Sequence, residues 1–291
     1  MHLPILTDSM LIVLAREAGA HALAWFVILF LLLQVEVGLL AWAARRFSQW
    51  RMDGRAHAFD RPSLERGLEL AVILSACLAF CAIAYEVAVG GTFVRVDQAF
   101  SAAVRDSTSE RTLQVFAWIT HLGDGSLLAV LCLSAALLLL RRGERLLAIG
   151  LVVAIGGNGL LNAVLKRVFE RVRPPPEHGL PIFHGWGFPS GHASGALVAY
   201  GILAYVLMRA LPRVWHFPVL LLAAAAAFLV GGSRIFLEAH FAGDVVAGFA
   251  SGTAWLVACI LGLERLRGRP RPVPSGVAPA LDAAVYPTLR L

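Results

Sequence analysis

Seven long apolar runs constrain this chain more than any other feature of its sequence. A helix needs about 20 apolar residues to cross the roughly 30 Å hydrocarbon core of a bilayer. Such runs occupy residues 22–44, 68–88, 124–140, 146–165, 193–211, 216–233 and 241–263, of which the third and sixth are short. The chain is 58% hydrophobic and 15% charged, more apolar and less charged than a soluble domain. It is therefore predicted to be an all-α, polytopic membrane helix bundle with about seven transmembrane helices.

The sequence carries little sign of a cleaved leader or of a metal centre. The N-terminus lacks the basic segment and the cleavage site of a secretory signal, so the first run is expected to be retained. Residues 9–15, SMLIVLA, are too short to cross and are expected to lie in the interface or to pack on the bundle. All four cysteines fall within predicted spans without metal-ligand spacing, which favours packing roles.

Arginine positions predict the orientation, because basic loops stay on the cytoplasmic side. Arginines gather in the 45–66 loop, the 141–145 turn and the tail after the last run. With seven crossings all three fall on one side, which predicts an outside N-terminus and a cytoplasmic C-terminus in the plasma (inner) membrane. Segments 89–123, 166–192 and 233–240 would then share the outer or periplasmic face. The net charge of +6 is attributed to this topology and to anionic lipid, with no nucleic-acid partner expected.

The first polar stretch on that face is KRVFERVRPPP. It holds Lys166, the only lysine in the sequence, and Arg173 seven residues later. Seven residues make two helical turns, so both cations are expected on one helix face until Pro174 stops the helix. Two cations on one face suit a dianionic phosphate. For this stretch alone, snorkelling side chains at the membrane surface are the favoured reading.

The second stretch is FPSGHASG. Ser190 is expected to begin a helix whose unpaired backbone N–H groups attract an anion. Gly191 would allow close backbone approach, and His192 in the first turn is a candidate proton donor. The alternative is an ordinary capped helix in which Gly191 and Gly195 pack on a neighbour, and the eight residues alone do not separate the two.

The third stretch, SRIFLEAHFAGD, supplies Arg234, His240 and Asp244. On a helix, His240 and Asp244 would lie one turn apart, where a carboxylate can fix the imidazole tautomer and leave the other nitrogen free to attack. Arg234 offers a planar fork to phosphate oxygens. The alternative is a snorkelling arginine beside a structural His–Asp pair. Glu238 is expected to face water or headgroups.

Other polar residues near or within the spans are given structural roles. His121 and Asp124 in THLGDGS either cap a helix or border the pocket, with capping favoured. Polar residues inside spans are expected to join helices by hydrogen bonds. They are Gln34 and Glu36 in the first run and Asn158 and Asn162 in the fourth.

Together the stretches read K-x6-RP, PSGH and SR-x5-H-x3-D, which resembles the signature of the type 2 phosphatidic acid phosphatase superfamily. These membrane lipid phosphatases share a helical core with vanadium haloperoxidases and bacterial acid phosphatases. The resemblance covers about residues 120–265, with every motif position filled in order. Members usually have six spans, so the 22–44 run looks like an added helix. We therefore divide the chain into a region with two extra-core transmembrane helices at 1–110, a lipid phosphatase core at 111–265 and a basic, Pro-rich tail at 266–291, expected to be disordered.

The resemblance also implies roles for the motif residues. His240 would be the nucleophile that forms a phosphohistidine, Asp244 would orient it, and His192 would protonate the leaving group and later activate water. The phosphoryl oxygens would be held by Lys166, Arg173, Ser190, Gly191 and Arg234. No metal and no cofactor is implied, because three cations can neutralise the charge on the transferring group.

The implied reaction is hydrolysis of a phosphomonoester or pyrophosphate of a phospholipid or isoprenoid lipid. Candidate substrates are undecaprenyl pyrophosphate, phosphatidylglycerophosphate, phosphatidate and diacylglycerol pyrophosphate. Two alternatives stay open: a lipid phosphotransferase using the same phosphohistidine, and a non-enzymatic lipid-binding or transport protein on the same fold. A haloperoxidase is disfavoured because those relatives are soluble. The sequence leaves the oligomeric state open.

Overall fold

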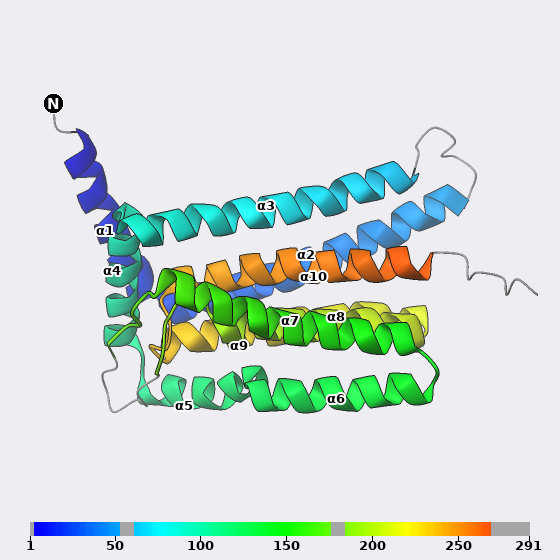
Figure 1. The fold of residues 1–291 in the computed structure, drawn as a ribbon. Helices are drawn as coiled ribbons and strands as arrows, with labels where there is room; N and C mark the ends of the chain where they lie inside the picture. The colour runs from blue at the N-terminus through cyan, green and yellow to red at the C-terminus, as the bar shows by residue number, and fades with distance from the viewer. Residues whose placement is uncertain (1–2, 53–60, 176–183, 269–291) are drawn as a thin grey trace, which may run out of the picture.

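The computed structural model of this chain describes residues 3–52, 61–175 and 184–268, and every regular element within them is a helix. The elements are α1 (Leu3–Ala20), α2 (Ala22–Met52), α3 (Arg61–Val89), α4 (Thr92–Ser107), α5 (Glu110–Ile119), η1 (Thr120–Gly123), α6 (Gly125–Arg141), α7 (Arg145–Phe169), α8 (Gly191–Ala210), η2 (Arg213–Trp215), α9 (His216–Phe236) and α10 (Ala242–Arg267). Figure 1 shows the long helices running side by side. The predicted all-α bundle is confirmed.

Within the described residues, seven helical segments are long and apolar enough to cross a membrane, as predicted. Six of them match the expected runs closely. The third was expected at 124–140, but the apolar segment extends from Glu110 to Arg141 through α5, η1 and α6. It begins earlier because Ser109 caps α5, its hydroxyl accepting a hydrogen bond from the Thr112 amide at 3.3 Å.

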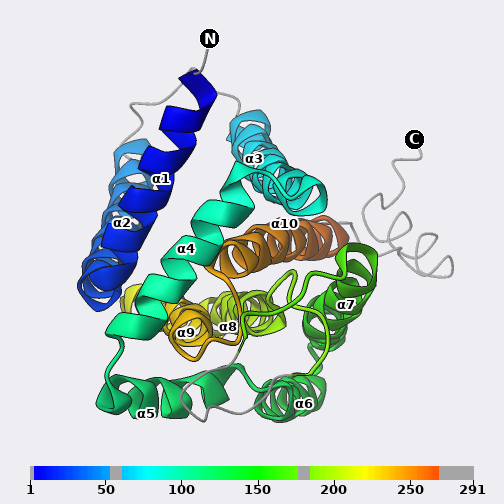
Figure 2. The ribbon, with the colours of Figure 1, turned by 90° about the vertical axis from the view of Figure 1, so that its left-hand side faces the viewer.

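Two shorter helices, α1 and α4, lie across one end of the bundle (Figures 1 and 2). They pack along each other, and the close approach uses Gly19, where a Cβ would meet the α4 backbone at 2.6 Å. Residues 9–15 form part of α1, where Ala15 is buried while Met10, Leu11, Val13 and Leu14 are exposed. The inward face of α4 carries Asp97, Ser101 and Val104, which are four and three residues apart and all buried.

The core of the bundle lies between α6, α7, α8 and α10, around buried residues such as Leu151 and Ile202. Polar groups also join α7 to α8. The Asn162 amide donates to the Ser194 hydroxyl at 2.7 Å, and Asn158 donates to the same oxygen at 3.4 Å, so the expected role of these asparagines is confirmed. Glu36, in contrast, is exposed on α2, so the expectation that it joins helices is wrong.

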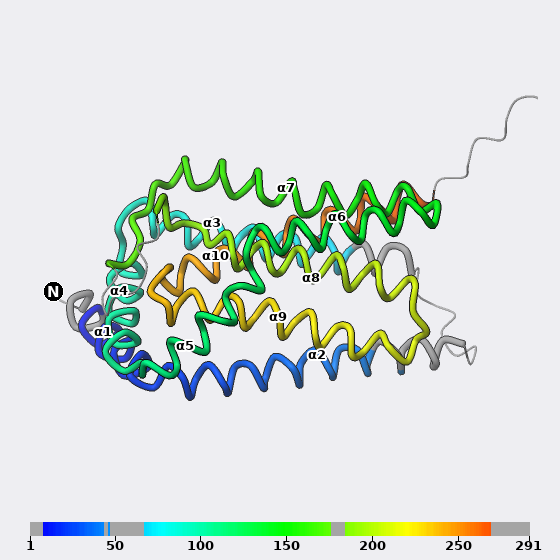
Figure 3. The backbone as a smooth tube through the Cα atoms, turned by 90° about the horizontal axis from the view of Figure 1, so that it is seen from below, coloured from blue at the N-terminus to red at the C-terminus, as the bar shows by residue number. Residues whose placement is uncertain are grey.

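The helices of the N-terminal region sit on the outside of this core. In Figure 3, α2 runs beside α9, and α3 packs against α10. The α4 end of the bundle also holds the ends of α7 and α9 and the starts of α8 and α10, whereas the α6–α7 turn lies at the other end (Figure 1). The predicted tail lies outside the described residues from position 269 onward.

Two glycines of α7 give a direct test of this packing. A Cβ at Gly157 would overlap the Trp255 ring of α10, whose indole N–H is anchored on the Ala154 carbonyl at 2.8 Å. Nothing lies within 4 Å of a Cβ at Gly159. Gly157→Leu should therefore cost about 1–3 kcal/mol through overpacking and lower the melting temperature of the detergent-purified protein. Gly159→Leu is the matched control, and equal melting temperatures for the two variants would contradict the packing.

Candidate active site

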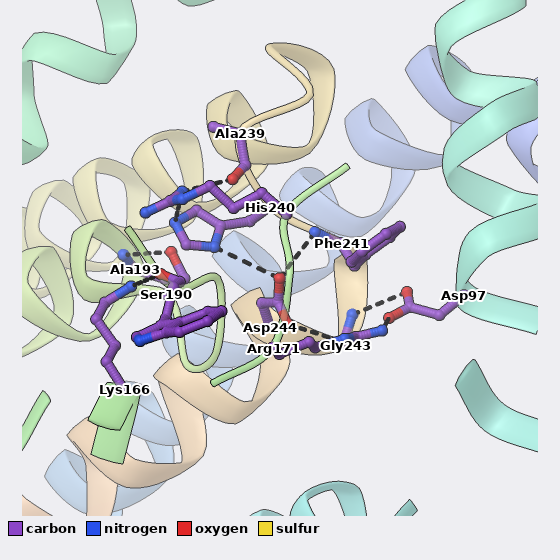
Figure 4. A network of polar contacts seen from close by, with 12 residues as sticks. Asp97, Lys166, Arg171, Ser190, Ala193, Ala239, His240, Phe241, Gly243 and Asp244 are labelled. Carbon is purple, nitrogen blue, oxygen red and sulfur yellow. Dashed lines mark hydrogen bonds and ion pairs between the residues drawn. The ribbon is translucent and has the colours of Figure 1, made fainter. Parts of the chain in front are cut away.

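The three polar stretches of the sequence converge at the α4 end of the bundle (Figure 4). Lys166 lies in the last turn of α7, and Arg234 lies in the last turn of α9. His240 occupies the turn between α9 and α10, and Asp244 follows in the first turn of α10. The positive charges of Arg173, Arg234 and Lys166 all act on His240, so the predicted cations surround the predicted nucleophile.

The route by which Arg173 reaches the site differs from the prediction. We expected Lys166 and Arg173 on one helix face up to Pro174, but α7 ends at Phe169. Glu170 is left-handed, with φ at +44°, and its amide donates to the Lys166 carbonyl as the helix closes. Arg173 therefore lies after the helix, in a segment without regular secondary structure, which fits the tendency of residues before proline to avoid the helical region.

The second stretch begins a helix as predicted. Ser190 is the N-cap of α8, and its fully buried hydroxyl accepts a hydrogen bond from the Ala193 amide at 3.4 Å. Its own amide donates to the Asp244 carbonyl at 2.9 Å, which ties the start of α8 to the start of α10. Gly191 follows as the first helical residue, where a Cβ would lie 3.9 Å from the Lys166 side chain.

His240 and Asp244 face each other, although not on one helix as expected. His240 precedes Phe241, the N-cap of α10, and this turn brings His240 Nδ1 to 3.5 Å from Asp244 Oδ2. The same carboxylate oxygen accepts the Phe241 amide at 3.0 Å. This contact holds the carboxylate against the helix N-terminus, where a negative charge is favourable.

The hydrogen-bond partners of His240 identify its tautomer. Arg173 Nη1 lies 3.0 Å from His240 Nε2, and a guanidinium can only donate, so Nε2 accepts. The proton of the neutral ring is then on Nδ1, facing Asp244. Burial, and then the charges of Arg173 and Arg234, hold the pKa of His240 well below its usual 6.5. The side chain is therefore a neutral imidazole at neutral pH, with its lone pair directed at the cations.

The three cations are held in place by protein oxygen atoms. Lys166 Nζ donates to the Trp186 carbonyl at 2.6 Å, and Arg234 Nη1 donates to the Thr120 hydroxyl at 2.6 Å. Arg173 donates to the Gly185 carbonyl at 3.0 Å and to the Ala239 carbonyl at 2.6 Å. Burial lowers the pKa of Arg173, yet a guanidinium keeps its charge at any physiological pH. These donors form a cationic pocket suited to a tetrahedral oxyanion.

Behind Asp244 lies a buried ion network that the sequence analysis missed. Arg171 donates to Asp244 Oδ1 at 2.6 Å and to Asp97 Oδ2 at 3.0 Å (Figure 4). Asp97 also accepts the Gly243 amide at 3.0 Å, and the Arg171 guanidinium lies 4.5 Å above the centre of the Phe241 ring. Burial raises the pKa of Asp97, while Arg171 opposes that rise. Arg171 lies within the stretch KRVFERVRPPP, but at a position that the motif K-x6-RP leaves unspecified. The sequence signal for Asp97 is its four-residue spacing from Ser101 on α4.

His192 contacts a second carboxylate. Its Nε2 lies 3.2 Å from Asp124 Oδ1, and the other oxygen of Asp124 lies 2.7 Å from His121 Nδ1. Asp124 is the N-cap residue of α6, but its side chain makes no capping hydrogen bond. The favoured capping role is therefore wrong, because the carboxylate turns toward the two imidazoles and borders the pocket.

Glu238 was expected to face water or headgroups, and that expectation is also wrong. The residue is only 4% exposed, and its φ of +53° is unusual for a side chain with a Cβ. The backbone reverses here, since the Ala239 and His240 amides both donate to the Arg234 carbonyl. Glu238 lines a cavity of about 250 Å³ together with Ser101 of α4.

The described residues hold no group of three or more His, Cys, Asp or Glu side chains placed to bind a metal ion. Asp97 belongs to the predicted 1–110 region, so that region contributes to the network behind Asp244. The division into 1–110, 111–265 and 266–291 stays a prediction.

Comparisons with known proteins agree with the motifs. The sequence model of the PAP2 superfamily matches residues 147–267. Phosphatidylglycerophosphatase B of Bacillus subtilis (strain 168) is 37% identical over 146 residues, which cover 48% of this chain and 69% of that protein. The crystal structure of the first transmembrane PAP2 type phosphatidylglycerolphosphate phosphatase from Bacillus subtilis is similar as well. It aligns with a TM-score of 0.60 and 32% identity over 68% of this chain and 98% of that chain.

The ion network predicts a pH-dependent loss of stability in Arg171→Met. Removing one partner of a buried ion pair costs about 3–5 kcal/mol, because Asp97 and Asp244 are left buried without their counter-charge. Both carboxylates would then resist ionisation in the folded state, so the free energy of unfolding should fall as pH rises. The stability deficit against the unchanged protein should be larger at about pH 8 than at about pH 5.

Thermal unfolding in detergent measures this deficit at each pH. Arg167→Met is the matched control, since Arg167 is an exposed arginine in the last turn of α7, four residues before Arg171. A deficit in Arg171→Met no larger than that of the control, or one independent of pH, would show that the network does not hold the site.

Proposed function

The chain belongs to the PAP2 superfamily and is a multi-pass membrane lipid phosphatase, and from this premise we propose that His240 cleaves a lipid phosphomonoester through a phosphohistidine. The relatives compared above are named for phosphatidylglycerophosphate, so we propose that lipid as the substrate. Phosphatidate, diacylglycerol pyrophosphate and undecaprenyl pyrophosphate are the alternatives to be compared in the same assay.

One observation supports this proposal most directly: the unprotonated nitrogen of His240 points at the cationic pocket. Nε2 accepts from Arg173 at 3.0 Å, while Nδ1 faces Asp244. A phosphoryl group held by Arg173, Lys166 and Arg234 would place its phosphorus next to a neutral imidazole nitrogen. Nucleophile, orienting carboxylate and charge stabilisation therefore occur together.

In the first step, the lone pair on His240 Nε2 forms a bond to phosphorus, and the bond from phosphorus to the glycerol oxygen breaks. The cations exchange their bonds to protein oxygens for bonds to the phosphoryl oxygens and so offset the charge of the transition state. His192 gives a proton to the departing alkoxide. The ring of His240 gains positive charge as the N–P bond forms, and Asp244 at 3.5 Å from Nδ1 stabilises it.

In the second step, water attacks phosphorus and the N–P bond breaks. The now neutral His192 accepts a proton from the water, and the electron pair of the N–P bond returns to His240 Nε2. Inorganic phosphate leaves, and both histidines recover their starting states. An acceptor alcohol in place of water would make the same site a phosphotransferase, so free phosphate released from lipid alone separates the two reactions.

Variants of two histidines test the proposed nucleophile. His240→Asn should lower phosphate release from phosphatidylglycerophosphate by at least about 10³-fold, because no other group supplies the attacking lone pair. His21→Asn is the control, since His21 is an exposed residue that pairs with Glu17. Substrate labelled in its phosphate should leave an acid-labile label on the control and none on His240→Asn.

The same assay with EDTA tests the proposed metal-free mechanism, for which activity should be unchanged. Unchanged phosphate release by His240→Asn would remove the proposed nucleophile. Loss of activity in EDTA that added divalent metal restores would instead show that a metal takes part.

The orientation generates its own prediction. We propose that the α4 end of the bundle faces the outside of the plasma membrane, because arginines follow the opposite ends of α6 and α10. A reporter fused after Leu291 should behave as cytoplasmic. A cysteine at Gly185, in a background that lacks the four native cysteines, should react with a membrane-impermeant reagent in intact cells. The reverse pattern in both assays would place the site on the cytoplasmic face.

A further inference from the structure

We propose that Asp124 is a positioning residue for His192, orienting its imidazole and favouring the imidazolium for transfer of a proton to the leaving group. The inference rests on the proposed function and assigns a role to a carboxylate outside the three motifs. Asp244 faces one histidine of the site, His240, and Asp124 contacts the other, His192.

The contacts of Asp124 link His192 to the surface of the protein. His192 lies in the first turn of α8, and Asp124 lies between η1 and α6. One carboxylate oxygen contacts His192 Nε2 at 3.2 Å, and the other contacts His121 Nδ1 at 2.7 Å. The exposed side-chain fractions rise from 30% for His192 through 37% for Asp124 to 65% for His121. The three groups therefore form a hydrogen-bonded path from the site toward solvent.

Backbone geometry supports the same placement. Gly123 precedes Asp124, and a Cβ there would lie 3.1 Å from His192 Cδ2 and would overlap Val230. Only glycine lets η1 come this close to the imidazole. The side chain of Asp124 makes no capping hydrogen bond to α6. Its main-chain carbonyl accepts a hydrogen bond from the Leu128 amide at 3.0 Å. The carboxylate is thus committed to the two histidines.

The charges around His192 explain why a carboxylate is needed. Arg234 of α9 and Arg173 of the segment after α7 both act on this imidazole, and His240 lies within electrostatic range. Burial first, and then these two positive charges, disfavour the imidazolium, which is the form that a general acid needs. Among the charged groups that act on His192 in the described structure, Asp124 is the one that opposes them. The Asp124 anion at 3.2 Å offsets part of that repulsion.

A purely structural role for Asp124 predicts a different behaviour. The connection between η1 and α8 has another tie, because the Tyr200 hydroxyl donates to the Leu122 carbonyl at 2.8 Å. Asp124→Asn keeps the shape of the side chain and removes its charge, so the variant should fold. Its defect should then appear only where a proton must be delivered to the leaving group.

Two substrates with different leaving groups separate these roles. An alkyl phosphate such as phosphatidylglycerophosphate needs its alkoxide protonated, whereas the nitrophenolate of p-nitrophenyl phosphate leaves without a proton. Asp124→Asn should lower kcat/KM for the lipid by about 10- to 100-fold, part of the range for general acid catalysis. Its pre-steady-state burst of nitrophenolate, which reports only the first step, should stay within about two-fold of the unchanged protein.

Two further measurements complete the test. His192→Asn should show the same dependence on the leaving group, and the double variant Asp124→Asn/His192→Asn should lose no more lipid activity than His192→Asn alone. In Asp124→Asn the alkaline limb of the lipid kcat/KM profile should move to lower pH, because the imidazolium has lost its counter-charge. Glu110→Gln, an exposed acid in the first turn of α5, is the charge-matched control and should behave as the unchanged protein.

Equal losses on both substrates, additive losses in the double variant, or no loss on the lipid would each overturn the inference while leaving the proposed function in place. The failure of the proposed function looks different. The unchanged protein would then release no phosphate from any lipid phosphate, and the role proposed for Asp124 would fall with it.

Discussion

The Arg171 guanidinium lies between two buried carboxylates that belong to helices far apart in the sequence. Asp97 comes from α4, which lies across the end of the bundle, and Asp244 comes from α10, which runs through it. Charges removed from water are tolerated only when each is paired with good geometry, and Arg171 supplies a separate N–H group to each carboxylate. Asp244 in turn faces His240 and, through its carbonyl, holds the Ser190 amide at the start of α8. The positions of the proposed nucleophile and of the start of α8 are both linked through Asp244 to this one side chain.

This dependence follows from how the bundle is held together. In a membrane, the hydrophobic effect does not drive helices against each other, so close packing and interhelical hydrogen bonds decide the arrangement. Between α7 and α8 the asparagines and Ser194 serve that purpose at depth. Near the interface the Asp97–Arg171–Asp244 network does so at the site itself. Stability and catalytic geometry thus share the same contacts.

The sequence was sufficient for the parts of the structure that depend on local patterns. Apolar run length predicted the seven spans, and motif spacing selected Lys166, Arg234 and His240, which the fold brings together. Expectations failed where a backbone reversal decides the outcome. Glu170 is left-handed and ends α7 early, and Glu238 is left-handed in the turn that buries its own carboxylate. Neither residue is glycine. The conformational preferences of single residues do not predict such positions, because tertiary contacts impose them.

The acidic partners of Arg171 and His192 could not be predicted from local sequence patterns either. Asp97 lies 74 residues from Arg171, and Asp124 lies 68 residues from His192. Each of these acids has a plausible local role, one on the polar face of an amphipathic helix and one as a helix cap. Only the folded arrangement shows that both face the site.

The carbonyl groups that hold the cations have a consequence for turnover. Lys166 and Arg173 already donate to the main-chain oxygens of Trp186, Gly185 and Ala239. An arriving anion must compete with these oxygens, so part of each bond that it gains is offset by a bond that the protein loses. In the proposed reaction, inorganic phosphate has no acyl chains to anchor it and would therefore be held weakly. The carbonyl oxygens would then compete with the phosphate product and favour its release, while the acyl chains would retain the lipid substrate.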